Sequence, residues 1–222
     1  MQNKTTYIMI DTSGSMRDCP THSRSSAVNQ AMREVMEEIL PRVLAEKDSE
    51  VVPYIAVLLF SGRSIEWHIP RTKMEDVSGN WLDIELSKFD GGTPTGEAIK
   101  TVIDDITNGC NGEPDPDAVA PAFLLISDGM PNGSNPTYEE ALGYADKNNP
   151  NYSPAFRHSN RIAIGIQVDA SGRDSLKKFG RVSNSVEAQG FDSYYDCTDS
   201  KRTALVEIIK SCTFALSVAS SS

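Results

Sequence analysis

The sequence predicts an α/β protein with a doubly wound, mostly parallel central sheet, one antiparallel edge strand and helices on both faces. Short apolar runs alternate with segments of helical periodicity, which is typical of strand–helix–strand units. The runs at residues 7–10 and 122–126 are nearly continuous, as expected for strands that are buried on both faces of a parallel sheet. Oxygen-bearing residues directly follow both runs, at the edge where such sheets bind ligands.

The first strand is expected at residues 5–11 and the first helix at residues 26–46. One face of this helix is apolar, with residues at helical spacing: Val28, Met32, Val35, Met36, Ile39, Leu40, Val43 and Leu44. Pro41 interrupts the pattern, and we expect it to kink the helix because proline lacks a backbone N–H.

A strongly apolar strand is expected at residues 51–60. Residues 64–70 are expected to return antiparallel beside it as an edge strand, which Pro70 would end because it cannot donate to a strand ladder. The stretch that follows is less regular, with candidate short elements at residues 74–77 and 81–86.

The next helix is expected at residues 93–108, with Thr93 as its N-cap and Pro94 at its first position. Its apolar residues follow helical spacing: Ile99, Val102, Ile103 and Ile106. A buried strand at residues 122–128 comes next, so Asp128 is expected at the carboxyl end of a strand.

The alternation continues to the end of the chain. We expect, in order, a helix at 137–146, a polar loop at 148–158, a strand at 161–168, a helix at 173–180, a strand at 191–195 and a helix at 200–216. Because no internal repeat or interdomain linker is visible, residues 1–222 are expected to form a single domain.

A D-x-S-x-S motif follows the first apolar run and contains Asp11, Ser13 and Ser15. It gathers a carboxylate and two hydroxyls on a tight loop, and Gly14 allows the sharp turn. Hard oxygen ligands suit a hard divalent cation such as Mg²⁺. Taken alone the motif is weak, because the same residue types form ordinary turns.

Two later segments add oxygen ligands. The run G-G-T-P-T at residues 91–95 offers the Thr93 hydroxyl beside a helix end, although a capped helix after a Gly-rich turn would read the same way. The run A-F-L-L-I-S-D-G at residues 122–129 places Asp128 at a strand end. Three separated segments therefore point to one site.

These motifs, in this order and strand context, resemble the von Willebrand factor A (VWA) family over nearly the whole chain, which implies a Rossmann-like doubly wound fold. In that family the three loops form the metal-ion-dependent adhesion site (MIDAS). The resemblance implies five metal ligands: Asp11, Ser13, Ser15, Thr93 and Asp128. Thr93, and not Thr95, takes the position of the family's threonine because it directly follows the Gly pair.

Within the family, the run S-D-G-M-P-N-G at residues 127–133 is most similar to small bacterial intracellular VWA proteins of the TerY type, which are associated with tellurium resistance and stress operons. That similarity implies a role in the tellurite or chemical-stress response, with kinase- or phosphatase-like proteins as partners. An accessory subunit of an AAA+ ATPase or chelatase-type complex is the alternative.

The resemblance also implies how the site works. Mg²⁺, with Mn²⁺ or Ca²⁺ as alternatives, would keep net positive charge because most of its direct ligands are neutral hydroxyls. An Asp or Glu carboxylate of a protein partner would then replace one water on the ion. The expected function is metal-dependent protein–protein interaction.

Composition also bears on which ligands the protein binds and on the compartment in which it is found. The formal charge of −10 argues against nonspecific binding to nucleic acid or to an anionic membrane. No apolar stretch approaches the ~20 residues that span a bilayer, and the start of the chain lacks the features of a signal peptide. The cysteines show no paired spacing, which favours free thiols in a reducing, cytoplasmic compartment: Cys19, Cys110, Cys197 and Cys212.

Two other clusters suggest metals but favour simpler interpretations. Cys19 and His22 form a C-x-x-H fragment without the companion pair that zinc needs, so we expect an exposed specificity loop. Glu113, Asp115 and Asp117 lack the EF-hand glycine and terminal glutamate, so we expect a solvated loop.

The remaining conspicuous side chains are expected to have ordinary roles. His68 and His158 have no evident partners, and packing is favoured over partner contact for Trp67 and Trp81. Met16 either lines the rim of the site or fills a core gap. Partner contacts are expected in the loops at residues 17–25, 62–64 and 131–135.

Catalysis is not expected. Ser13 or Ser15 would need an activating base to act as a nucleophile, and no His or Lys accompanies the motif in a hydrolase pattern. Neither a G-x-S-x-G elbow nor a P-loop is present. Phosphorylation of Asp11 is disfavoured because the D-x-D of haloacid-dehalogenase-type enzymes is absent.

Overall fold

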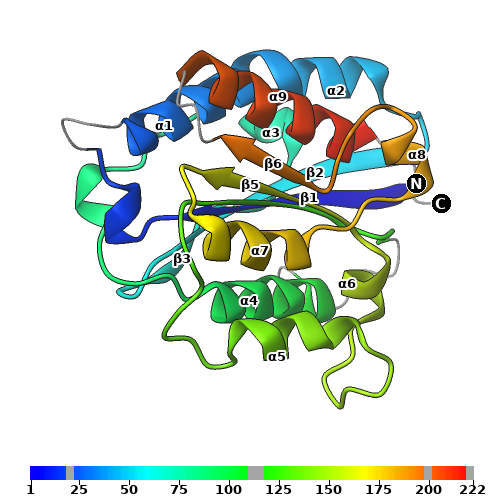
Figure 1. The fold of residues 1–222 in the computed structure, drawn as a ribbon. Helices are drawn as coiled ribbons and strands as arrows, with labels where there is room; N and C mark the ends of the chain where they lie inside the picture. Colours follow the sequence, from blue (N-terminus) through cyan, green and yellow to red (C-terminus); the bar gives the residue numbers. More distant parts are fainter. Residues whose placement is uncertain (19–22, 110–117, 198–201, 219–222) are drawn as a thin grey trace.

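In the computed structural model, which describes residues 1–18, 23–109, 118–197 and 202–218, six strands form one mixed sheet (Figure 1). The strands are β1 (Gln2–Asp11), β2 (Val51–Phe60), β3 (Ile65–Lys73), β4 (Ala122–Ser127), β5 (Asn160–Ile166) and β6 (Tyr194–Cys197). Their order is β3-β2-β1-β4-β5-β6, and β3 pairs antiparallel with β2 at one edge. The predicted fold class is confirmed.

Helices cover both faces of the sheet (Figure 1). They are α1 (Arg24–Glu34), α2 (Leu40–Glu46), α3 (Met74–Val77), α4 (Thr95–Asn108), α5 (Tyr138–Leu142), α6 (Pro154–His158), α7 (Ala170–Phe179), α8 (Asn184–Glu187) and α9 (Arg202–Val218). On one side α1, α2, α3 and α9 enclose one apolar core, and on the other α4 to α7 enclose a second. In the part of the chain described, no helix is long and apolar enough to cross a membrane.

The register of the parallel strands brings their carboxyl ends together. Ile10 of β1 pairs with Ile126 of β4, and Asp11 pairs with Phe60 of β2. Ser127 at the end of β4 pairs with Gly165 of β5. The segments that follow β1 and β4 therefore begin side by side at one edge of the sheet.

The first helix is interrupted where Pro41 was expected to kink it. A π-helical turn at Val35–Ile39 separates α1 from α2, and the Leu40 N–H donates to Val35 O. The wider turn accommodates a proline ring that would clash with the carbonyl four residues earlier in a regular helix.

The expectation that Pro70 ends the edge strand is wrong, because β3 continues to Lys73. Pro70 is exposed, and it lies between Ile69 and Thr72, where the pairing with β2 shifts register. A bulge on an edge strand needs no N–H from this residue, so proline is tolerated there.

Several short elements also differ from expectation. Residues 81–85 are irregular, and a 3₁₀ turn forms at Leu86–Lys88 instead. The expected loop at 148–158 contains α6, which Ser153 caps by accepting the Phe156 N–H at 3.2 Å. Helix α8 was not expected, and β6 begins three residues later than predicted because β5 pairs with residues 194–197.

Candidate metal centre

Asp11 anchors the site at the end of β1. It is 0% exposed, and its carboxylate accepts hydrogen bonds from the Ser13 N–H at 2.7 Å and the Ser127 hydroxyl at 2.6 Å. One of these partners belongs to the loop that follows Asp11, and the other is the last residue of β4. The carboxylate therefore has a fixed orientation that spans two neighbouring strands.

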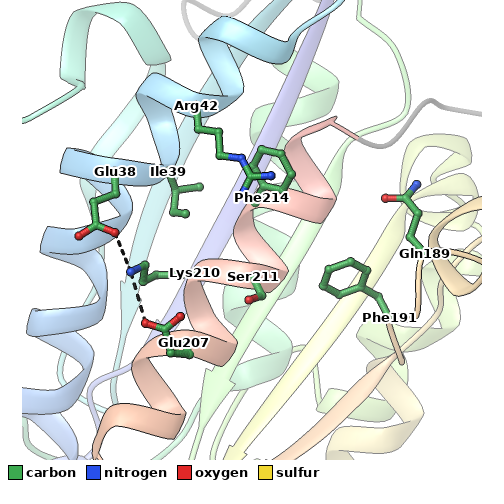
Figure 2. A pocket seen from close by; sticks show the side chains of 9 residues that line it. All are labelled: Glu38, Ile39, Arg42, Gln189, Phe191, Glu207, Lys210, Ser211 and Phe214. Atoms are coloured by element: carbon green, nitrogen blue, oxygen red, sulfur yellow. Dashed lines mark hydrogen bonds and ion pairs between the residues drawn. The ribbon is translucent and has the colours of Figure 1, made fainter.

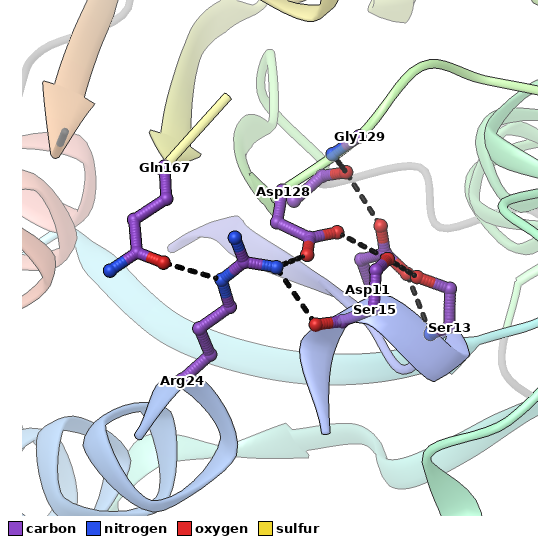
Figure 3. Close-up of polar contacts among 8 residues, drawn as sticks. Asp11, Ser13, Ser15, Arg24, Asp128, Gly129 and Gln167 are labelled. Atoms are coloured by element: carbon purple, nitrogen blue, oxygen red, sulfur yellow. Dashed lines mark hydrogen bonds and ion pairs between the residues drawn. The ribbon is translucent and has the colours of Figure 1, made fainter. Parts of the chain in front are cut away.

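A chain of hydrogen bonds links the D-x-S-x-S motif to Asp128 (Figure 3). The Ser13 and Ser15 hydroxyl oxygens lie 3.1 Å apart, and the Ser15 hydroxyl donates to Asp128 Oδ1 at 2.8 Å. Asp128 directly follows β4 and is buried, whereas Ser15 is exposed. Four of the five predicted residues are thus brought together at an edge that is open to solvent.

Thr93, the fifth residue, lies beside this chain. It is buried, and a Cβ on Gly129 would stand 3.9 Å from its hydroxyl oxygen. Thr93 is not the N-cap as expected, since α4 begins at Thr95 with Pro94 in the N-cap position. Its backbone instead pairs with Asn132, whose side-chain oxygen accepts the Thr93 N–H at 3.0 Å and whose own N–H donates to Thr93 O at 2.9 Å.

Glycines allow the three loops to approach one another. Gly91 has a φ of +80°, and its carbonyl accepts the Gly14 N–H at 3.1 Å. At Gly92 a Cβ would lie 2.4 Å from the Asn132 side-chain oxygen, so a larger residue would displace the group that accepts the Thr93 N–H. Both positions fix the Thr93 segment against its neighbours.

An arginine that sequence reasoning missed also contacts the site. Arg24, the first residue of α1, forms an ion pair with Asp128 and donates from the same nitrogen to Ser15 O at 2.8 Å. Its Nε donates to the Gln167 side-chain oxygen at 3.1 Å (Figure 3). No local motif marks Arg24 or Asn132, whereas Ser127 could have been noticed as the hydroxyl beside Asp128.

The electrostatics of the site favour a cation. Burial raises the pKa of Asp11 to about 7, hydrogen bonds from Ser127 and Ser13 oppose that rise, and the charge of Asp128 adds to it. The donor set consists of two carboxylates and three hydroxyls, all of them hard oxygens. In the part of the chain described, no group of three His, Cys, Asp or Glu residues could hold a metal, so the hydroxyls would have to be ligands.

Residues 6–130, more than half of the chain, match the family model of the von Willebrand factor type A domain. The chain belongs to this family. Domains of the family are typically metal-dependent modules of protein interaction, and their metal site is the MIDAS. No curated protein sequence matches the chain significantly.

Solved structures with the same fold include three from different kinds of protein. SpaC, a pilus adhesin from Lactobacillus rhamnosus GG, has a TM-score of 0.62 at 15% identity, and the match covers 97% of this chain and 31% of the adhesin chain. A proximal thread matrix protein from the mussel byssus, with a zinc-occupied MIDAS motif, has a TM-score of 0.63 at 16% identity, covering 96% and 48%. BatB from Bacteroides thetaiotaomicron has a TM-score of 0.53 at 17% identity, covering 94% and 98%.

The chain therefore spans less than half the length of the adhesin and of the byssus protein. At such low identities the likeness shows the fold and no more. That the five predicted residues bind a metal stays a prediction, because the structure shows their placement only.

Two of the loops predicted to contact a partner lie beside the site. Arg63 pairs with Asp90 at 2.7 Å, next to the Gly91 turn, and Asn132 is bonded to Thr93. The loop at residues 17–25 is described only in part. Cys19 and His22 lie outside the described residues, and so do Cys110, Glu113, Asp115 and Asp117.

The other conspicuous side chains have packing roles. Met16 is fully buried in the core that α1 and α9 enclose. Trp67 and Trp81 are half-buried and pack against the two cores, as expected. The centres of the His68 and Trp81 rings lie 4.6 Å apart, and His68 Nε2 lies 2.7 Å from Leu82 O, so the expectation that His68 has no partner is wrong. His158 ends α6. Cys197 and Cys212 are free and buried.

A cavity of about 510 Å³ lies between the π-helical turn with α2, helix α9 and the segment that follows α8 (Figure 2). Lys210 on its wall contacts Glu38 at 2.7 Å and Glu207 at 3.4 Å, and the Arg42 guanidinium lies 4.0 Å from the centre of the Phe214 ring. These charges are matched within the wall, and we assign no ligand to the cavity.

Proposed function

We propose that the chain is a metal-dependent protein-interaction module that binds a partner's Asp or Glu carboxylate through a divalent cation. The observation that supports this most strongly is the hydrogen-bonded chain from Asp11 through the Ser13 N–H and the Ser13 and Ser15 hydroxyls to Asp128, with Thr93 beside it. Asp11 and Asp128 would hold the ion directly or through water, and the hydroxyls would supply neutral ligands.

The balance of ligands explains why a partner's carboxylate would bind. Neutral hydroxyls leave part of the ion's charge uncompensated, and the exposed position of Ser15 lets a partner reach it. Mg²⁺ fits an all-oxygen donor set, with Mn²⁺ and Ca²⁺ as alternatives. The zinc in the mussel protein supports a divalent cation and leaves its identity to experiment.

We further propose that the protein acts inside a bacterial cell in the tellurite or chemical-stress response, alongside kinase- or phosphatase-like partners. This rests on the TerY-like run at residues 127–133. The free, buried thiols of Cys197 and Cys212 agree with a reducing compartment. An accessory subunit of an AAA+ ATPase or chelatase-type complex remains the alternative, and copurification of such an ATPase would favour it.

We propose no catalytic role. Ser15 donates to Asp128, and the contacts described for Ser13 and Ser15 include no histidine that could activate them. Incubation of the pure protein with ATP and with generic phosphate esters tests this, and release of phosphate above the level of an Asp11→Asn variant would overturn it.

A pull-down from lysate of the native cell tests the interaction directly. The bait is wild type in Mg²⁺, wild type in EDTA, or Asp11→Asn in Mg²⁺. Asparagine keeps an oxygen toward the Ser13 N–H, so this variant removes charge with little change of shape. Capture in the first sample alone supports the proposal, whereas equal capture in all three moves the interaction to another surface.

A further inference from the structure

A positive charge is already present at the candidate metal centre. The Arg24 side chain is 14% exposed and pairs with the Asp128 carboxylate, whose side chain is 0% exposed. The same guanidinium nitrogen donates to Ser15 O, on the residue whose hydroxyl bonds Asp128. Arg24 therefore contacts one predicted carboxylate ligand and the backbone of one predicted hydroxyl ligand.

Other parts of the fold hold this arginine in place. Gln167 follows β5 and accepts from Arg24 Nε at 3.1 Å. Gln167 has a φ of +54°, a left-handed conformation that is uncommon for a residue other than glycine. Its N–H donates to Cys197 O at 3.3 Å, which ties it to β6. The start of α1 is also fixed, because the Ser26 N–H donates to the Asp18 carboxylate at 3.3 Å and 3.2 Å.

The charge balance at the site follows from these contacts. Asp11 and Asp128 contribute two negative charges when both are ionised, and Arg24 contributes one positive charge beside them. A divalent cation would then leave the loaded site with a net charge of about +1 instead of about zero. This weakens attraction between the protein and the ion and strengthens attraction between the loaded site and an anion.

We propose that Arg24 is a built-in cation that lowers the affinity of the centre for its metal and raises the affinity of the loaded centre for a partner's carboxylate. The inference rests on the proposed metal-binding function. It assigns Arg24 a positioning and tuning role, because it acts through Asp128 and through the charge of the site.

Replacement of Arg24 separates these two effects. With Arg24→Gln we expect Mn²⁺ to bind more tightly by on the order of tenfold, since repulsion between charges a few ångströms apart is of that size even in a water-like dielectric. We expect the loaded variant to bind acetate more weakly by about threefold or more. Arg24→Lys keeps the charge and should stay near wild type in both respects.

The experiment is a Mn²⁺ titration followed by electron paramagnetic resonance, and then an acetate titration of the loaded protein followed by broadening of the acetate methyl signal. Arg33→Gln is the matched control, because Arg33 lies on the same helix and pairs with the exposed Asp83 at 2.9 Å. Thermal unfolding in EDTA checks that each variant folds.

Opposite shifts for Mn²⁺ and acetate in Arg24→Gln, with little change in Arg24→Lys and Arg33→Gln, support the proposal. A purely structural role would weaken both kinds of binding, which would overturn it, as would unchanged Mn²⁺ affinity. Tighter Mn²⁺ binding without weaker acetate binding would overturn its second half. If neither wild type nor Arg24→Gln binds Mn²⁺, the proposed function itself fails, which distinguishes that failure from failure of this inference alone.

Discussion

Buried charge occurs at both ends of the sheet, but with opposite sign and different compensation. At the amino ends of the strands, Lys4 of β1 and Arg161 of β5 are buried cations. At the carboxyl ends, Asp11 and Asp128 are buried carboxylates. The cations lie at opposite sides of β4, whereas the carboxylates share one chain of hydrogen bonds.

Neutral groups compensate Arg161. Its Nε donates to Phe179 O at 2.9 Å, another nitrogen donates to Phe156 O, and the guanidinium lies 4.3 Å from the centre of the Phe156 ring. Burial lowers the pKa of Arg161 to about 10. This arrangement is complete without a ligand. At the carboxyl end two carboxylates share one network with a single cation, Arg24, so one negative charge is left uncompensated when both carboxylates are ionised. The amino end is therefore structural and the carboxyl end suits binding.

The largest expected effect on stability lies at the amino end. Arg161→Met removes hydrogen bonds to two backbone carbonyls and the contact with Phe156, so we expect a loss of about 3 kcal/mol in the free energy of unfolding. Urea unfolding in EDTA measures it. The matched control is Arg42→Met, since Arg42 stacks on Phe214 at 4.0 Å but is exposed, and should lose about 1 kcal/mol or less. Equal losses would contradict the comparison.

The next effect lies at the carboxyl end. At a Mg²⁺ concentration of 100 times Kd, wild type should gain about 2.7 kcal/mol of stability, and Asp11→Asn should gain almost none. Thermal unfolding with and without Mg²⁺ measures both. A similar gain in the variant would exclude Asp11 from the metal site.

The same variant makes a prediction about pH. Because the folded-state pKa of Asp11 is raised to about 7, the folded protein holds a proton that the unfolded chain releases near pH 4. The contribution of Asp11 to metal-free stability therefore falls as pH rises from about 4 to about 7. Asp11→Asn should lack this fall, and the difference between the two unfolding curves in EDTA measures it.

A smaller effect is expected at Lys4. Burial lowers its pKa to about 8, so protonation of Lys4 opposes folding at neutral pH. Lys4→Met removes this titrating group. Wild-type stability should gain from Lys4 as pH rises from about 8 to about 10.5, and the variant should lack this gain. The same pH dependence in both proteins between pH 8 and pH 10.5 would contradict this prediction.

The smallest effect on stability is expected at an exposed ion pair, which serves as the reference for the buried charges at both ends of the sheet. Arg33 and Asp83 form an ion pair with side chains 44% and 53% exposed. Arg33→Gln should change the unfolding free energy by less than about 0.5 kcal/mol, because exposed pairs contribute little. A larger change in urea unfolding would mean that surface charge, and not burial, dominates the stability of this protein.

Local patterns account for what sequence alone could predict. The apolar runs locate β1, β2, β4 and β5. Asp11 ends β1, and Ser13, Ser15 and Asp128 follow β1 or β4 closely, so their position at a strand end identifies them as candidates. The glycine pair before Thr93 identifies it as a candidate ligand. The prediction that Thr93 is the N-cap of α4 fails, because hydrogen bonds with Asn132 hold its backbone instead.

The rest depends on contacts between distant residues. Arg24 meets Asp128 across 104 positions, and no spacing rule connects them. Pro70 is compatible with β3 only because the strand bulges at an edge, which the pairing with β2 determines. Helices α6 and α8 are too short for their periodicity to be recognised.

The central claim is that one divalent cation binds at the carboxyl edge of the sheet. The most direct test is Mn²⁺ binding by electron paramagnetic resonance in wild type, Asp11→Asn and the charge-matched control Asp83→Asn, whose carboxylate is exposed and pairs with Arg33. We expect one bound ion in wild type and in Asp83→Asn, and none at the same concentration in Asp11→Asn. Equal binding by all three proteins, or none by wild type, would contradict the claim.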